Sequence, residues 1–315
     1  MSETLFKTMR VIALPTKTDF RGIKLREVAL FQGIQGWSEF SPFLEYSPQE
    51  CGPWLKSAIE AATTPRPKFY RSSIPVNATM PALNEKAKIE SVLNSFPGCE
   101  VVKVKVGENL QEDLERVAHI KSLQPDIRLR FDVNGSWSVD QALNSLSQLR
   151  RNFGPLEYVE QPCATVEELR ELKGRLPFDI PIVVDEIIRK ARDPFEVDLT
   201  GAADILMLKV QPLGGIERSI KIASHHGMPV VVSSALESAV GISYGLELAA
   251  AIEELDFSCG LATGALLESD VSQIPIVDGF MNLCQVEPHF EPYLVSPERH
   301  QWWEDRVMKT WDVIR

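Results

Sequence analysis

Long apolar runs, basic clusters and paired cysteines are all missing from this sequence. No apolar stretch approaches the roughly 20 residues that a bilayer-spanning helix needs, which predicts a chain without a membrane anchor. Residues 1–10 are polar and mixed in charge, and no apolar segment of the kind found in secretory signal peptides follows them. The net charge of −11 includes no long run of lysine or arginine, so nucleic acid and anionic membrane surfaces are poor candidate partners.

The cysteines exclude two further classes of protein. There are five, scattered along the chain, and none belongs to a C-x-x-C pair. A disulfide framework and a cysteine-ligated zinc site are therefore not expected. The remaining composition, with 44% hydrophobic and 24% charged residues among 315, is that of a globular chain of about two domains. We predict a soluble cytoplasmic protein with free thiols, and the sequence leaves its oligomeric state open.

The N-terminal part of the chain predicts a small α+β unit. Residues 22–31 and 36–40 alternate in polarity like antiparallel strands, and residues 47–62 have a helical pattern. The proline-containing segment 63–71 has the composition of a linker.

The C-terminal stretch, which is rich in tryptophan, is expected to fold back onto this unit from about residue 288. We therefore assign residues 1–72 and about 285–315 to one domain, which caps the rest of the chain. Residues 73–284 form the other domain.

A strand–helix alternation fills the centre of the chain. Apolar segments bounded by turn residues recur at intervals of roughly 25 residues, the length of one βα unit. With a first strand near 75–79, they predict eight parallel strands of an α/β fold that closes into a (β/α) barrel. An open doubly wound sheet is the alternative, but no G-x-G-x-x-G motif follows an early strand, which disfavours its nucleotide-binding version. The other seven predicted strands are 101–106, 127–133, 156–161, 181–185, 204–210, 229–233 and 257–261.

Helix termini support this alternation. Thr165 and Glu168 have the spacing of a capping box, and Ser138 precedes a helical apolar pattern that it can cap. Gly227 stands where a helix ending at residue 226 needs a left-handed residue.

Charged residues alternate with apolar ones in several of the predicted strands. In 127–133 the odd-numbered residues are apolar, whereas Arg128, Arg130 and Asp132 share the opposite face. In a barrel the apolar face packs on the helices, so the charged face is predicted to point into the interior. The charges also lie near the carboxyl ends of their strands, where barrel active sites are built. The candidate site residues are Lys103, Lys105, Asp132, Glu160, Asp185 and Lys209.

Each of these residues taken alone has a simpler explanation. A single lysine in a strand usually marks an exposed edge, and a single carboxylate after a strand usually caps a helix or lies in a loop. Together they place six ionised groups in a confined interior, which costs several kcal/mol each unless they pair with one another and with a cation. Three carboxylates from consecutive strands suit Mg²⁺ better than zinc, because no histidine or cysteine joins them. A cation flanked by lysines can support removal of a weakly acidic proton next to a carboxylate.

The motifs around these residues resemble the muconate-lactonizing branch of the enolase superfamily over the whole chain. A base combined with Mg²⁺ is the established pattern of that superfamily and no new deduction. The resemblance implies a modified TIM barrel of the (β/α)7β type, with an N-terminal capping domain completed by the C-terminal segment. The matching motifs are Lys-x-Lys at 103–105, Asp-x-Asn-Gly-x-Trp at 132–137, Glu-Gln-Pro at 160–162, Asp-Glu at 185–186, Lys209, and Gly-Trp-Ser-Glu-Phe-Ser-Pro at 36–42.

Within this branch the sequence is most similar to the actinobacterial o-succinylbenzoate synthase family, which catalyses a dehydration in menaquinone biosynthesis. This resemblance implies a small carboxylate as substrate and Mg²⁺ as cofactor, with Mn²⁺ as the alternative ion. The segments that carry the similarity are 20–22, 40–46, 76–79, 209–215, 233–238 and 259–263.

The same resemblance implies a role for each candidate residue. Lys105 takes the proton alpha to the substrate carboxylate and then protonates the departing hydroxyl group. Lys209 stabilises the resulting enediolate by its charge, and Lys103 tunes Lys105. The metal ion is held by Asp132, Glu160 and Asp185. Substrate binding is assigned to Arg21 on a mobile capping loop, Asn134, Ser233, Ser234, Gly260 and Leu261.

Several alternatives stay open at this point. Ile187 stands where relatives carry serine after Asp-Glu, and Glu186 is the alternative to Asp185 as third metal ligand. N-acylamino acid racemase, dipeptide epimerase and muconate cycloisomerase reactions are alternatives on the same scaffold. More remote is a non-catalytic barrel that binds a metal or an acid, because all six charged positions are filled. A phosphate-binding barrel is also disfavoured, because residues 233–236 are a poor match to a glycine-rich loop.

Overall fold

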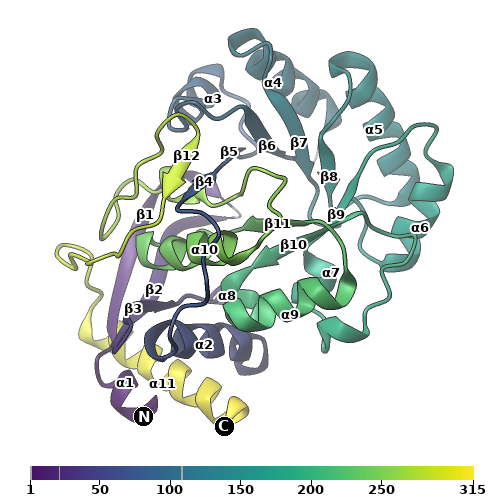
Figure 1. Cartoon of the computed structure of the whole chain (residues 1–315). Helices are drawn as coiled ribbons and strands as arrows, with labels where there is room; N and C mark the ends of the chain where they lie inside the picture. The colour runs from purple at the N-terminus through teal and green to yellow at the C-terminus, as the bar shows by residue number, and fades with distance from the viewer. Residues whose placement is uncertain (1, 21, 108) are drawn as a thin grey trace.

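The computed structural model describes residues 2–20, 22–107 and 109–315, and shows an antiparallel sheet packed beside a curled parallel sheet (Figure 1). The antiparallel sheet has the strand order β1–β2–β3. In β2, Val28 and Leu30 contribute to the large core shared with the barrel, while Ala29 and Phe31 contribute to a separate core under the N-terminal helices. Both faces of this sheet are therefore buried. The N-terminal elements are α1 (Ser2–Phe6), β1 (Arg10–Phe20), β2 (Ile23–Gly33), β3 (Gly36–Phe40) and α2 (Pro48–Thr63).

Helix α2 begins where the sequence predicts it. Ser47 is its N-cap and forms a capping box with Glu50, so two otherwise unsatisfied backbone donors are paired. The capping box of Thr165 with Glu168, the Ser138 cap and the left-handed Gly227 are likewise confirmed.

The parallel sheet is the predicted barrel, and its strands follow one another in chain order from β5 to β11. The predicted eighth strand, 257–261, is not a continuous strand. Only Cys259 and Gly260 pair, with Val76 and Ser233 respectively. These two parallel bridges still join the first and last strands, so they close the barrel. The barrel strands are β5 (Ala78–Met80), β6 (Val101–Lys105), β7 (Arg128–Asp132), β8 (Tyr158–Glu160), β9 (Ile182–Val184), β10 (Ile205–Lys209) and β11 (Val230–Ser233).

The strand predicted near 75–79 is also split in the structure. Its first part is β4 (Ser73–Pro75), which pairs antiparallel with β12 (Phe280–Asn282) outside the barrel. Only β5 joins the parallel sheet. The hydrophobic pattern predicted the location of the segment. The change of partner depends on β12, which is too distant in the sequence for any local pattern to indicate it.

Helices cover the outside of the curled sheet, as the strand–helix alternation predicts (Figure 1). The barrel interior holds a small apolar cluster of Tyr158, Val183, Ile205, Met207 and Val231. The helices after α2 are α3 (Lys86–Leu93), α4 (Leu110–Leu123), α5 (Val139–Phe153), α6 (Val166–Arg175), α7 (Glu186–Arg189), η1 (Pro194–Glu196), α8 (Val210–Leu213), α9 (Ile216–His226), α10 (Ala239–Ala251), η2 (Ala262–Leu266) and α11 (Pro297–Ile314).

The C-terminal helix α11 lies against the N-terminal unit, and both chain ends are close together in Figure 1. Trp303 is fully buried in the same apolar cluster as Trp54 of α2, and its Nε1 donates to Glu27 Oε2 of β2 at 2.8 Å. The C-terminal stretch therefore folds back as expected, while the domain boundaries near residues 72 and 285 remain predictions.

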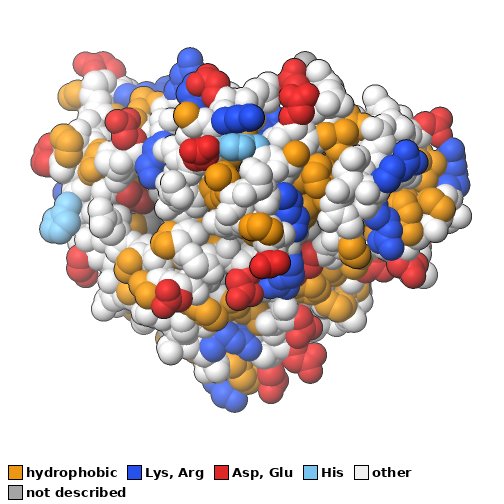
Figure 2. All heavy atoms as spheres, turned by 90° about the horizontal axis from the view of Figure 1, so that it is seen from above, with side chains coloured by type: hydrophobic (Ala, Val, Ile, Leu, Met, Phe, Trp, Pro, Cys, Tyr) orange, Lys and Arg blue, Asp and Glu red, His pale blue; other side chains and the backbone are white. Residues whose placement is uncertain are grey.

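The face of the molecule shown in Figure 2 is mixed in charge. On the face shown in Figure 2, lysine and arginine side chains are interspersed with aspartate and glutamate side chains. Within the described ranges, none of the helices combines the length and the apolar character that crossing a membrane requires.

Candidate active site

Five of the six candidate charged residues lie at the carboxyl ends of neighbouring barrel strands, and Lys103 lies two residues before the end of β6. Lys105 ends β6 and pairs in register with Asp132, the last residue of β7, which pairs in turn with Glu160, the last residue of β8. Asp185 directly follows β9, and Lys209 ends β10. Strand alternation turns these side chains inward, because the intervening residues pack on the helices.

The structure brings the lysines and carboxylates into direct contact. Lys103 Nζ lies 2.9 Å from Glu160 Oε2 and 3.2 Å from Asp132 Oδ2. Lys105 Nζ donates to the same Asp132 oxygen. Lys209 Nζ donates to Asp185 Oδ2 at 2.6 Å. Five of the six are buried and Lys105 is half-buried, so the pairing offsets a large desolvation cost.

The shared environment shifts the pKa values of these lysines in opposite directions. Burial would lower the pKa of Lys103, but the Glu160 and Asp132 carboxylates outweigh it and raise that pKa. The pKa of Lys105 is lowered, because burial and the positive charges of Lys103 and Lys209 together outweigh the Asp132 carboxylate. A lowered pKa favours the neutral amine, which is the form that accepts a proton.

The carboxylates also differ from one another. Burial alone would raise their pKa values, but the lysine charges hold the pKa of Asp132 below the ordinary range, and Lys209 and Arg189 do the same for the pKa of Asp185. Burial and repulsion from Asp132 and Asp185 raise the pKa of Glu160 to about 7. The three carboxylates therefore act on one another electrostatically across the barrel mouth.

The residues present fit a divalent cation once the carboxylates release their lysine partners. As the side chains stand, no three His, Cys, Asp or Glu residues of the described ranges are arranged to hold a metal ion. The oxygens nearest the lysines accept from them instead. Glu160 Oε1, however, is buried without a hydrogen-bond partner in the described part of the chain. A cation beside it would supply that partner and relieve the repulsion among three hard oxygen donors.

A small pocket opens above these charges, between the barrel and the N-terminal unit. Phe43 and Trp54 form the wall on the N-terminal side, with ring centroids 6.0 Å apart. The barrel side combines charged, polar and small residues. They are Thr79, Lys103, Lys105, Asn134, Arg189, Lys209, Pro212, Ser234 and Ala235.

The residues predicted to bind substrate are placed differently from one another. Asn134 lines the pocket and its Oδ1 accepts from Lys105 Nζ at 3.0 Å. Ser234 also lines it, and its hydroxyl bonds the carbonyl of Gly260. Ser233, Gly260 and Leu261 are buried and do not line this pocket. The Ser233 hydroxyl donates to the Gly260 carbonyl. Arg21 lies outside the described residues.

Two further residues near the site were not predicted from the sequence as site residues. Arg189 of α7 lines the pocket and donates to Asp185 Oδ1 at 3.1 Å. The spacing of four residues between them is a signal that helical pairing could have provided. Gln161 Oε1 accepts from the backbone amides of Asp185 and Ile187. The backbone at Ile187 is therefore held by Gln161.

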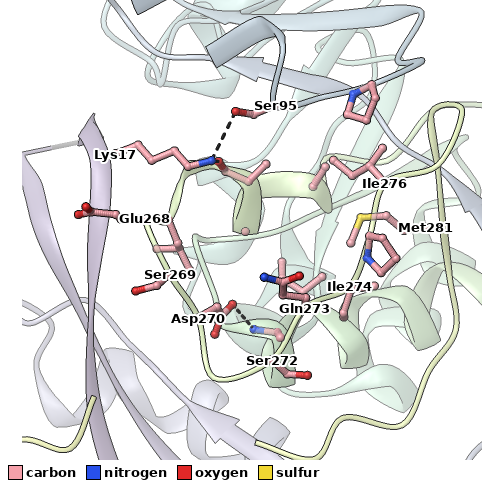
Figure 3. A pocket seen from close by; sticks show the side chains of 18 residues that line it. Lys17, Ser95, Glu268, Ser269, Asp270, Ser272, Gln273, Ile274, Ile276 and Met281 are labelled. Carbon is pink, nitrogen blue, oxygen red and sulfur yellow. Dashed lines mark hydrogen bonds between the residues drawn. The ribbon is translucent and has the colours of Figure 1, made fainter. Parts of the chain in front are cut away.

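A second, larger pocket lies away from these charges (Figure 3). Lys17 of β1 reaches across it, and its Nζ donates to the Ala265 carbonyl at 2.8 Å. Asp270 lies at its base, where Oδ2 accepts from the Ala239 amide at 2.8 Å. None of the six candidate charged residues lines this pocket, so it is a separate feature.

Two family models match the chain. One, described as Enolase C-terminal domain-like, matches residues 89–288, and the other, described as Enolase N-terminal domain-like, matches residues 11–62. The first covers most of the barrel and the second covers the antiparallel sheet and most of α2.

Two comparisons with known proteins extend this match. The o-succinylbenzoate synthase of Mycobacterium ulcerans is 47% identical over 317 residues, which is 98% of this chain and 95% of the relative. That of Mycobacterium tuberculosis is 47% identical over 319 residues, covering 99% and 96%.

Solved structures share the fold at lower identity. The L-Ala-D/L-Glu epimerase from Bacillus subtilis has a TM-score of 0.74 at 20% identity, covering 91% of this chain and 98% of that one. The muconate lactonizing enzyme from Pseudomonas putida has a TM-score of 0.70 at 20% identity, covering 94% and 97%. The family models and the near-full-length relatives together show that the chain belongs to the enolase superfamily and, within it, to the o-succinylbenzoate synthase family.

Proposed function

We propose that this protein is an o-succinylbenzoate synthase, a lyase that dehydrates 2-succinyl-6-hydroxy-2,4-cyclohexadiene-1-carboxylate to 2-succinylbenzoate. The observation that carries the proposal is the 47% identity to enzymes of that name over 98% of the chain. The pocket agrees with it chemically, because two buried or half-buried lysines and a carboxylate cluster meet under an aromatic wall.

In the proposed reaction Lys105 acts first as base and then as acid. Its neutral amine takes the proton from the carbon that bears the substrate carboxylate, which leaves an enediolate. The resulting ammonium then gives that proton to the hydroxyl group on the adjacent carbon. Water departs as the ring double bond forms and the carboxylate is restored. The lowered pKa of Lys105 supports the first step, because it increases the fraction of the lysine that is in the neutral amine form.

Lys209 and Lys103 support Lys105 in different ways. Lys209 reaches the pocket from β10 and is assigned to stabilise the enediolate by its positive charge. Lys103 lies beneath Lys105, and its ammonium is held between Glu160 and Asp132. Its charge lowers the pKa of Lys105.

Enzymes of the enolase superfamily use a divalent metal ion, and we propose Mg²⁺ for this chain, with Mn²⁺ as the alternative. Asp132, Glu160 and Asp185 are the residues assigned to hold it, with Glu186 as the alternative to Asp185. When bound, the cation neutralises negative charge that develops on the substrate carboxylate. The cytoplasmic location expected from the sequence remains a prediction.

N-Acylamino acid racemisation is the second candidate. It is favoured by one observation, the presence of Lys105 and Lys209 in the same pocket, since a two-base racemase needs a lysine on each side of the substrate carbon.

The two candidates are separated by assaying one purified preparation with Mg²⁺ on both substrates. Dehydration of the cyclohexadiene carboxylate is measured by the absorbance of the aromatic product, and N-succinylamino acid racemisation by polarimetry. We expect the kcat/KM for dehydration to be at least about 100-fold above that for racemisation. The threshold is about 2.7 kcal/mol of transition-state discrimination. Racemisation equal to or faster than dehydration would make the second candidate the main function.

A further inference from the structure

Arg189 is buried where the barrel meets the N-terminal unit. Its side chain is 5% exposed, and its guanidinium donates to three different side chains. Nε donates to Asp185 Oδ1 at 3.1 Å, Nη2 to Glu186 Oε1 at 2.7 Å, and Nη1 to the Tyr46 hydroxyl at 3.0 Å. A planar fork with fixed donor directions can hold three acceptors at once, which a lysine ammonium at this position could not reproduce.

Tyr46 connects this arginine to the N-terminal unit. Its ring packs against Phe43 and Trp54, the aromatic wall of the pocket, at centroid distances of 5.5 and 6.3 Å. Its carbonyl accepts from Arg306 Nη2 of α11 at 3.2 Å. The loop that presents the Tyr46 hydroxyl is therefore fixed by both α2 and α11.

On the barrel side, Arg189 reaches the charged cluster by two routes. Asp185 presents one oxygen to Arg189 and the other to Lys209 Nζ at 2.6 Å. Glu186 Oε1 also accepts from Asn134 Nδ2 at 3.1 Å, and Asn134 in turn accepts from Lys105. Both carboxylates that could serve as third metal ligand are therefore held by this one guanidinium.

We propose that Arg189 is a positioning residue that orients Asp185 for a divalent cation and links that carboxylate to the capping domain through Tyr46. Arg189 is anchored at three points, whereas Lys209 bonds Asp185 through a flexible four-carbon chain. When a cation competes for Asp185, Lys209 is the partner that turns away, and Arg189 keeps Oδ1 so that Oδ2 faces the ion. The inference rests on the proposed cation site. The arginine acts on the ion through Asp185.

Direct titration of Mg²⁺ and of Mn²⁺ into the metal-free protein by calorimetry tests this role without using activity. Partners that orient metal ligands typically contribute 10–100-fold to metal affinity, so we expect Arg189→Gln to raise the Kd of Mg²⁺ by about that factor. Arg189→Lys keeps the charge without the fork and should recover less than half of the loss on a logarithmic scale. Tyr46→Phe should raise the Kd several-fold, and adding it to Arg189→Gln should have no further effect, because Tyr46 acts through Arg189.

Arg192→Gln is the matched control, because Arg192 is exposed, lies three residues further along and lines a neighbouring groove. It should leave the Kd within twofold of the wild-type value. The proposal is overturned if Arg189→Gln binds Mg²⁺ as the wild type does, if Arg189→Lys restores binding fully, or if the Tyr46→Phe effect is additive. A wild-type protein that binds neither ion would instead refute the cation site itself, and the positioning role with it. Thermal unfolding of each metal-free variant checks folding, and if Arg189→Gln does not fold, Tyr46→Phe and Arg189→Lys decide the matter.

Discussion

Lys103 and Lys105 are two residues apart on one strand, yet their surroundings shift their pKa values in opposite directions. Lys103 contacts two carboxylates, whereas Lys105 shares one of them and lines the pocket. In a parallel barrel both side chains point inward, and the one nearer the carboxyl end of the strand is closer to the substrate. Position along β6 therefore separates a structural ammonium from a candidate base.

Replacement of Lys105 by alanine tests this assignment at the residue scale. We expect Lys105→Ala to lower kcat for dehydration by about 10²–10⁴-fold, the usual contribution of a positioned acid–base group. Circular dichroism and thermal unfolding should stay close to wild type, since the side chain is half-buried at the pocket wall. Lys190→Ala, at an exposed position outside the pocket, is the control and should keep full activity. Undiminished turnover in Lys105→Ala would rule out the proposed mechanism and revive the non-catalytic alternative.

At the scale of elements, three carboxylates gather at the N-terminus of α10, and two of them, Glu39 and Glu237, are buried. Glu39 of β3 accepts from the backbone amides of Ser238 and Gly241 at 3.1 and 3.0 Å. The N-terminal amides of a helix favour negative charge, which is one reason why acidic residues are tolerated here. Glu237 and Asp270 lie at the same helix end, so the N-terminal unit, the loop after β11 and the loop after η2 meet there.

Burial raises the pKa of Glu237 to about 7, with a smaller contribution from repulsion by Glu39 and an opposing one from Arg26. A carboxyl whose folded pKa is raised favours folding below its unfolded pKa, and this contribution is lost as pH rises through about 7. We therefore expect the free energy of unfolding to fall between about pH 5 and about pH 8, because the raised pKa of Glu237 lies in that window. In Glu237→Gln this fall should be smaller by on the order of 1–3 kcal/mol.

Urea denaturation of both proteins across this pH range measures the difference. Glu268→Gln is the control, because Glu268 is an exposed carboxylate near the same helix end. It should keep the wild-type pH dependence. An identical pH dependence in Glu237→Gln and wild type would contradict the raised pKa of Glu237.

For the whole molecule, the central feature is a pocket whose walls come from both structural units. The aromatic wall comes from the N-terminal unit and the charged floor from the barrel strands. Removal of the proposed metal ion should therefore lower the free energy of unfolding as well as the activity. At an Mg²⁺ concentration one hundred times its Kd, binding should stabilise the folded state by about 2.7 kcal/mol.

Differential scanning calorimetry with and without Mg²⁺ measures this stabilisation as an increase in Tm, and a chelator should remove both the increase and the activity. Asp132→Asn loses a charged ligand and should show no increase. Asp126→Asn removes an exposed carboxylate just before β7, at the opposite end of that strand from Asp132, and should respond like wild type. An equal increase in Asp132→Asn would place the bound ion elsewhere.

Local patterns in the sequence predicted much of this molecule. Strand alternation and strand-end position identified the six charged residues, and hydrophobic periodicity identified the barrel and helix α2. The patterns were less informative where partners are distant in sequence. Segment 257–261 pairs only at Cys259 and Gly260, and β4 leaves the barrel for β12. No local pattern encodes either outcome, because each depends on which backbone groups the folded chain brings alongside.

The sequence by itself determined which side chains face the barrel interior and at which end of each strand they stand, because alternation and turn positions are properties of neighbouring residues. Tertiary structure alone decided how those charges pair. Lys103 lies between carboxylates of two other strands, and Arg189 joins helix α7 to Tyr46 of the N-terminal unit, 143 positions away. Ion pairs and burial depend on distance in space, and the pKa values and the proposed cation site follow from them.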